Sequence, residues 1–145
     1  MAETVLSAEL AAAGLDGAVV VDSAGTGDWH IGDAMDPGAR AALARRGHDG
    51  SAHRARQFQP SWLRERDLIL AMDARNLADL RLVAPGQDLD RIRLFSEVGR
   101  LAETDISDPW GSGPDEFGHV LDLLGAAAPV IAARLARLLE PVPPE

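Results

Sequence analysis

The stretch Asp67-Leu-Ile-Leu-Ala-Met-Asp73 decides the fold class of this chain. Its five consecutive apolar residues are typical of a strand buried on both faces, and Asp73 can cap a helix that runs to about Leu82. A shorter apolar run at Ala18 to Val21 and the segment from Arg91 to Phe95 predict two further strands. Because strands alternate with helices, we expect an α/β fold in which helices flank a parallel sheet on both faces.

Two helices are predicted on either side of the strand at Ala18 to Val21. Apolar residues recur at spacings of three and four from Met1 to Ala13, and Gly14 is a natural helix stop. Asp36-Pro37 supplies an N-cap and a first-turn proline for a second helix, which we expect to end near Arg46. Ligands of parallel sheets bind beyond the carboxyl ends of the strands, so the loops that follow the strands are the expected site.

A long final helix is expected to begin at Pro114. It contains Pro129, which cannot donate a hydrogen bond to the carbonyl of Gly125, so we predict a kink or break between these two residues. The last five residues, 141–145, are Pro-rich and predict a tail. A chain of 145 residues that is 46% hydrophobic can bury one core, and we expect a single domain over residues 1–140.

Composition excludes several classes of function. A formal net charge of −9, with 23 acidic and 14 basic residues, argues against a nucleic-acid partner. With no leader-like start and no apolar stretch of 18 or more residues, we expect a cytoplasmic protein with no membrane partner. The absence of Cys excludes disulfides, thiolate metal sites and a cysteine nucleophile within these residues. The histidines lack zinc-ligand spacing, so no metal and no other cofactor is predicted.

Six segments occur in the order and spacing found in the low-molecular-weight protein tyrosine phosphatase family, and the chain resembles that family over nearly its whole length. These segments are Met1-Ala2-Glu3, Ser23-Ala24-Gly25-Thr26 with Trp29 and Gly32, Asp36-Pro37, His53 to Gln57, Asp67 to Asp73 with Asn76, and Asp108-Pro109-Trp110. The resemblance implies a three-layer α/β fold and hydrolysis of phosphotyrosine in protein substrates through a cysteinyl-phosphate.

The family's first strand and phosphate loop have no counterpart here. In the family a loop of the form Cys-x-Gly-Asn-x-Cys-Arg-Ser-Pro precedes Met-Ala-Glu, whereas this sequence starts at Met1. The resemblance therefore implies that the loop and the central strand lie upstream of Met1 in the sequence. In the family's sheet this central strand lies between the strands matching Ala18 to Val21 and Asp67 to Met72. We expect the chain as given to be an N-terminally truncated phosphatase domain without a nucleophile, and to be inactive.

The resemblance implies a role for four residues that are present. Asp108 matches the general acid that protonates the leaving phenolate, although a solvated acid in an acidic loop is the alternative. Trp29 and Trp110 match the aromatic walls that hold the phosphotyrosine ring, and Gly111 stands where a second aromatic often follows. His53 matches a histidine that supports the phosphate loop.

Other functions are also compatible with the sequence. Ser23 and Thr26 lie near the expected rim, but neither has an evident base to make it a replacement nucleophile. A degenerate, non-catalytic protein could bind a phosphopeptide through Trp29 and Trp110. An arsenate reductase of the same fold would need further cysteines downstream, and the chain has none. Nothing in the sequence predicts the oligomeric state.

Overall fold

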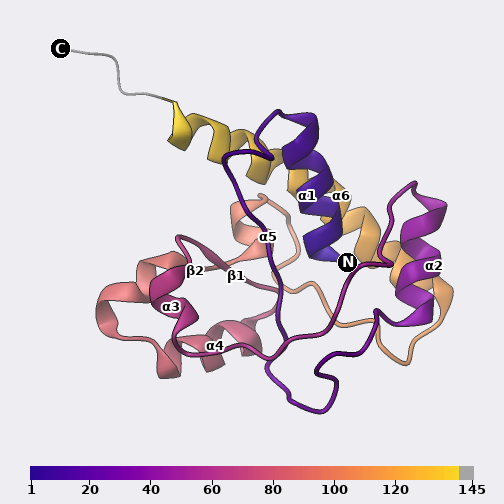
Figure 1. Ribbon diagram of the computed structural model, residues 1–145, viewed down its shortest axis with the longest axis horizontal. Coiled ribbons are helices and arrows are strands. Elements are labelled where there is room, and N and C mark those ends of the chain that lie inside the picture. The colour runs from indigo at the N-terminus through magenta and orange to yellow at the C-terminus, as the bar shows by residue number, and fades with distance from the viewer. Residues whose placement is uncertain (141–145) are drawn as a thin grey trace.

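Two helices that are far apart in the sequence, α1 (Ala2–Ala12) and α6 (Pro114–Leu139), lie side by side and form the main helical layer (Figure 1). The structure is a computed structural model and describes residues 1–140. Helix α1 buries Val5, Leu6 and Leu10 in a core shared with α6, as the spacing of its apolar residues predicts. The chain leaves α1 through Gly14, whose φ of +71° explains the glycine.

Helix α2 (Pro37–Arg45) packs against the first half of α6, as Figure 1 shows. The carboxylate of Asp36 accepts a hydrogen bond from the Ala39 N–H at 3.0 Å, so the predicted N-cap is confirmed. Ala42 and Leu43 are fully buried and join the same core as α1 and α6. The long helix α6 therefore packs against both α1 and α2.

The sheet consists of two short parallel strands, β1 (Ile69–Ala71) and β2 (Ile92–Leu94), with Ile69 opposite Ile92. They are connected through α4 (Ala74–Val83) and the 3₁₀ helix η1 (Gly86–Arg91), the crossover expected between parallel strands. The predicted parallel pairing is confirmed, but both strands are shorter than predicted. Phe95 begins a further short helix, α5 (Phe95–Val98), instead of ending the strand.

A second hydrophobic cluster lies beside this pair of strands. It joins the sheet to α4 and to α3 (Trp62–Glu65), a short helix that the sequence reading missed. Its buried members are Leu63, Ala71, Leu80 and Ile92. The carboxylate of Asp73 accepts the Asn76 N–H at 2.7 Å, so the predicted cap of α4 is confirmed.

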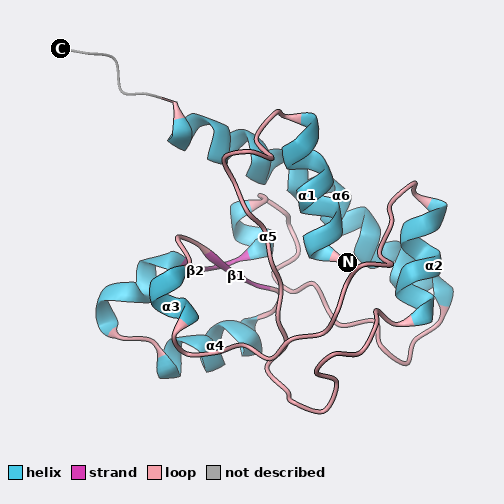
Figure 2. Ribbon diagram, viewed as in Figure 1, coloured by secondary structure: helices cyan, strands magenta, loops and turns pink. Residues whose placement is uncertain are grey.

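The predicted strand at Ala18 to Val21 is wrong, because this segment is drawn as loop in Figure 2 and forms no ladder. Val20 is 93% exposed. A strand exists only where a neighbour exchanges hydrogen bonds with it. Among residues 1–140, β1 pairs with β2 along one edge and no strand pairs with its other edge. The apolar run therefore remains extended without a partner.

Of the kink or break predicted in the last helix, the break is wrong, because α6 continues from Pro114 through Pro129 to Leu139 as one helix. The kink stays a prediction. Pro129 is exposed, while Ala127, Ala128 and Ile131 around it are completely buried. We attribute the continuity to packing against α1 and α5, which holds the turns on both sides of the proline.

Helix α6 is long and apolar enough to cross a membrane by length and composition alone, with a mean hydropathy of 1.4 over its most apolar window. The sequence prediction that no such stretch exists therefore needs correction. This is weak evidence for a membrane span, because core helices of soluble proteins pass the same test. In this structure α6 packs against α1, α2 and α5. The predicted tail, 141–145, lies outside the described residues.

Candidate active site

The loop that carries Asp108 is attached to the carboxyl end of β1. The buried Ile106 donates its N–H to the carbonyl of Met72 at 2.8 Å, directly after the strand. Asp105 accepts the N–H of Ala74 at 2.9 Å, in the first turn of α4. Because two anchors fix the start of this loop, Asp108 lies at the edge of the sheet where ligands of α/β folds bind.

Asp108 itself is exposed and accepts a hydrogen bond from the backbone N–H of Trp110 at 3.0 Å. Its carboxylate therefore orders the tight turn through Pro109 and fixes where Trp110 begins. Behind this turn is a cavity of about 300 Å³. The cavity is lined by the loop that carries Asp108, called the acid loop below, and by Glu116, His119, Val120 and Leu123 of α6.

The first turn of α1 lies within electrostatic reach of Asp108. Burial lowers the pKa of the Met1 amino group, and the negative charges of Glu3 and Asp108 oppose that shift. The start of a helix presents unpaired backbone N–H groups and the positive end of its dipole. An anion in front of α1 would therefore also lie near the carboxyl group of Asp108.

The two predicted wall residues are large apolar side chains at the surface. Trp29 is 77% exposed and Trp110 is 67% exposed. Both rings contact the ring of His30, with centroid separations of 6.4 Å to Trp29 and 6.3 Å to Trp110. The structure thus brings the two indoles to one histidine, which the sequence reading did not identify. Exposed aromatic clusters of this kind mark binding surfaces.

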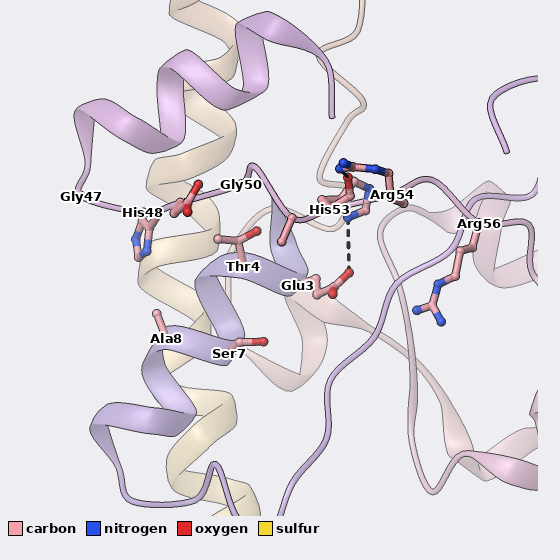
Figure 3. A pocket seen from close by; sticks show the side chains of 12 residues that line it. Glu3, Thr4, Ser7, Ala8, Gly47, His48, Gly50, His53, Arg54 and Arg56 are labelled. Carbon is pink, nitrogen blue, oxygen red and sulfur yellow. Dashed lines mark hydrogen bonds and ion pairs between the residues drawn. The ribbon is translucent and has the colours of Figure 1, made fainter. Parts of the chain in front are cut away.

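His53 contacts Glu3 of α1. Its Nδ1 lies 3.5 Å from the Glu3 Oε2, and the same carboxylate oxygen accepts a hydrogen bond from the Ser23 hydroxyl. Figure 3 shows Glu3 facing His53 beside a cavity of about 680 Å³ between α1 and the loop that carries Arg54. Glu3 therefore joins three segments at the start of α1.

The contact between Glu3 and Ser23 corrects one expectation, because a carboxylate does lie beside this serine. Glu3 belongs to the Met-Ala-Glu motif, so its presence was visible in the sequence. Its partners could not be predicted from the sequence, because Ser23 and His53 lie in loops far along the chain.

A second set of contacts holds the loop that leads to Ser23. Asp22 accepts hydrogen bonds from the Arg66 guanidinium, at 2.7 Å from Nη2, and Arg56 lies 3.4 Å away. The hydrogen bond from Arg66 lowers the pKa of Asp22, although partial burial opposes the shift. Both guanidinium groups lie over the Trp62 ring, at 5.3 Å for Arg56 and 5.0 Å for Arg66. Trp62 thus packs against both guanidinium groups.

Taken together, these contacts define an α/β protein whose site combines a carboxylic acid, an exposed aromatic cluster and a helix N-terminus at one end of a parallel sheet. The family model of the low molecular weight phosphotyrosine protein phosphatases matches residues 1–140. The chain belongs to the low molecular weight protein-tyrosine phosphatase family.

Individual relatives agree with this assignment. The low molecular weight protein-tyrosine-phosphatase of Streptomyces coelicolor is 40% identical over 144 residues, which cover 97% of this chain and 87% of the relative. YfkJ of Bacillus subtilis is 33% identical over 138 residues, covering 94% and 87%. A crystal structure of the protein tyrosine phosphatase of Entamoeba histolytica matches with a TM-score of 0.89 and 27% identity, covering 94% of this chain and 87% of that one.

Proposed function

We propose that this chain carries the general acid and the aromatic walls of a protein tyrosine phosphatase site, and that it hydrolyses phosphotyrosine only when a cysteine-bearing phosphate loop is supplied. The sequence holds no Cys. The family assignment implies phosphoprotein substrates, and phosphotyrosine is the proposed target. Without a thiolate, the 145 residues are expected to be inactive.

In the proposed reaction, a thiolate of the added loop attacks phosphorus, and the bond to the phenolic oxygen breaks. Asp108 gives its proton to that oxygen, so that a neutral phenol leaves instead of a phenolate. A water molecule then attacks the cysteinyl-phosphate, and Asp108 takes a proton from it. Inorganic phosphate is released and both the thiolate and the acid are regenerated.

The observation that carries this proposal is the turn in which the Asp108 carboxylate accepts the N–H of Trp110, because it joins an acid to an exposed aromatic ring. The N–H groups of the first turn of α1 would hold the phosphate. The negative charge of Asp108 opposes the lowering of the pKa of the Met1 amino group, which supports an acid near the start of α1. The N–H bond of Trp110 to Asp108 supports its proposed contact with the phenyl ring.

The contacts of Glu3 support a structural role for His53 in this site. Glu3 ties His53 and Ser23 to the first turn of α1, where the phosphate loop would join. We infer that His53 holds that loop in shape and has no part in proton transfer. Ser23 uses its hydroxyl to bond Glu3, so it is assigned to the same support and not to nucleophilic attack.

The test is to fuse the family's strand and loop, of the form Cys-x-Gly-Asn-x-Cys-Arg-Ser-Pro, directly before Met1. This extended protein is expected to hydrolyse a phosphotyrosine peptide. A matched protein whose first loop cysteine is replaced by serine is expected to be inactive. A folded extended protein that releases no phosphate would contradict the proposal.

A non-catalytic phosphopeptide-binding protein is the second candidate, because Trp29 and Trp110 are exposed in the chain without any added segment. Calorimetric titration of the 145-residue chain with a phosphotyrosine peptide separates the two. Micromolar binding that is lost in Trp110→Ala favours a binding role; no measurable binding favours the enzyme. A single domain in the cytoplasm, without nucleic-acid or membrane partners, remains part of the leading proposal. The net charge of −9 supports the expected lack of a nucleic-acid partner.

A further inference from the structure

The ring of His30 lies between the two tryptophans of the candidate site. It meets Trp29 edge-on, at an interplanar angle of 71°, and Trp110 at 50°. Both centroid separations, 6.4 and 6.3 Å, are within the range in which aromatic pairs attract one another. His30 therefore links the loop after Thr26 to the loop that carries the acid.

The backbone beneath His30 is well fixed although its ring is exposed. Its Nδ1 lies 3.1 Å from Oδ2 of Asp33, and its carbonyl accepts the Asp33 N–H at 2.9 Å. Gly32 allows this turn, with a φ of +85°. Gly32 and Asp33 exchange hydrogen bonds of 2.8 Å with the backbone of Ala55. These hydrogen bonds fix the turn against the segment that contains Ala55.

Trp29 is located from a second side by Gly27. A Cβ atom at Gly27 would lie 2.5 to 2.7 Å from the indole ring of Trp29, so the ring rests on the bare backbone of the glycine. Trp110 is located by its N–H bond to Asp108. Each indole is therefore held at its base by its own loop, and His30 is the contact between them.

We propose that His30 is the positioning residue of this aromatic pocket, holding Trp29 and Trp110 in a fixed relation so that one phenyl ring meets both. This inference rests on the proposed phosphatase function for its substrate. His30 touches the walls and not the reacting phosphate, so it acts on the binding of the aromatic group and not on the chemical step.

The coupling between the walls is tested in the 145-residue chain by NMR of the three indole N–H signals. Trp110→Leu is expected to shift the Trp29 signal, and this effect is expected to disappear when His30→Ala is also present. His30→Phe, which keeps a ring, is expected to restore it. The Trp62 signal, from an indole that packs against Phe58 elsewhere, is the internal control. An effect of Trp110→Leu that is equal with and without His30 overturns the proposal.

The functional consequence is tested in the extended protein. His30→Ala is expected to raise KM for phenyl phosphate about threefold to tenfold with little change in kcat, because only aromatic contacts are lost. KM for glycerol phosphate, which has no ring, is expected to stay unchanged, and His30→Phe is expected to recover the aromatic preference. Equal changes for both substrates overturn the proposal.

Failure of the two proposals can be told apart. An extended protein that folds but lacks phosphatase activity contradicts the proposed function, and the NMR coupling then decides the role of His30 without reference to catalysis. An active enzyme in which His30→Ala leaves both the coupling and KM unchanged contradicts the role of His30 alone.

Gly27→Ala is a second variant that moves one wall without touching His30. The new methyl group displaces the Trp29 ring, because the indole is the flexible partner in that contact. The Trp29 signal is expected to shift and its response to Trp110→Leu to vanish, while the Trp62 signal stays in place. A Trp29 signal that is insensitive to this change would place the ring elsewhere.

Discussion

Asp108 and Trp110 share one short turn, so the same backbone positions the proposed general acid and one of the proposed aromatic walls. The Trp110 N–H bonds the Asp108 carboxylate, and Pro109 between them is buried. This arrangement leaves the second carboxylate oxygen of Asp108 available for a proton donated to a leaving group. The role of the acid can therefore be separated from that of its neighbours by substitution.

Asp108→Asn in the extended protein is expected to reduce kcat for phenyl phosphate about 10²- to 10⁴-fold, the usual contribution of a general acid. The reduction is expected to be smaller for p-nitrophenyl phosphate, because its phenolate leaves more readily without a proton. Initial rates for the two esters measure the difference. Asp115→Asn, the same change at an exposed acid in α6, serves as control, and equal losses for the two esters would remove Asp108 from this role.

At this scale the sequence predicted residues that stand in linear motifs. Asp108, Trp29, Trp110 and His53 could each be located by a short pattern. The links of His30 to both indoles could not, because a contact between distant loops leaves no local signal. The role of Gly27 could not be predicted either, because it depends on the space that the absence of a side chain leaves for the Trp29 ring.

The elements that the sequence predicted well are those with a local signal. Helices α1, α2 and α4 agree with their caps and apolar spacing to within one or two residues. The failed strand at residues 18–21 has the right composition, but pairing is a non-local property. Short elements such as α3 and α5 also escaped, because four residues are too few to show a period.

The contact between α5 and α6 is close enough to be tested by one methyl group. A Cβ at Gly99 would lie 2.9 Å from the Cα of Ala127 and closer still to its Cβ. Gly99→Ala is therefore expected to lower the free energy of unfolding by about 1 to 3 kcal/mol through overpacking. Urea denaturation followed by circular dichroism measures it.

Gly125→Ala, in α6, is the matched control, because a Cβ there meets no atom within 4 Å. It is expected to stabilise the protein by up to about 1 kcal/mol, since alanine favours helix more than glycine. A neutral Gly99→Ala would show that α5 and α6 are further apart than described.

At the scale of the molecule, the extended segment after α1 is held by side chains where it has no strand partner. Asp22 joins it to Arg66 and Arg56, which stack on Trp62. Glu3 joins it to the start of α1 through Ser23. These two attachments keep the loop with Trp29 near the acid loop even though the segment forms no sheet.

The Asp22 attachment predicts a dependence of stability on pH. The folded-state pKa of Asp22 is lowered, so its ionisation stabilises the fold above the ordinary value of about 3.9 and this stabilisation is lost as the pH falls through the lower, folded-state pKa. Asp22→Asn is expected to lower the urea midpoint at pH 7, and the difference from wild type is expected to shrink in acid. Asp16→Asn is the control, and a difference that is constant with pH would contradict this account.

The central claim is that residues 1–145 hold the acid and the walls of a phosphatase site but no nucleophile. The most direct measurement is the release of p-nitrophenolate from p-nitrophenyl phosphate by the purified chain as its sequence stands, at enzyme concentrations high enough to detect a single turnover. The account predicts a rate equal to that of the ester in buffer and no burst. A turnover above that background which is lost in Asp108→Asn would contradict it.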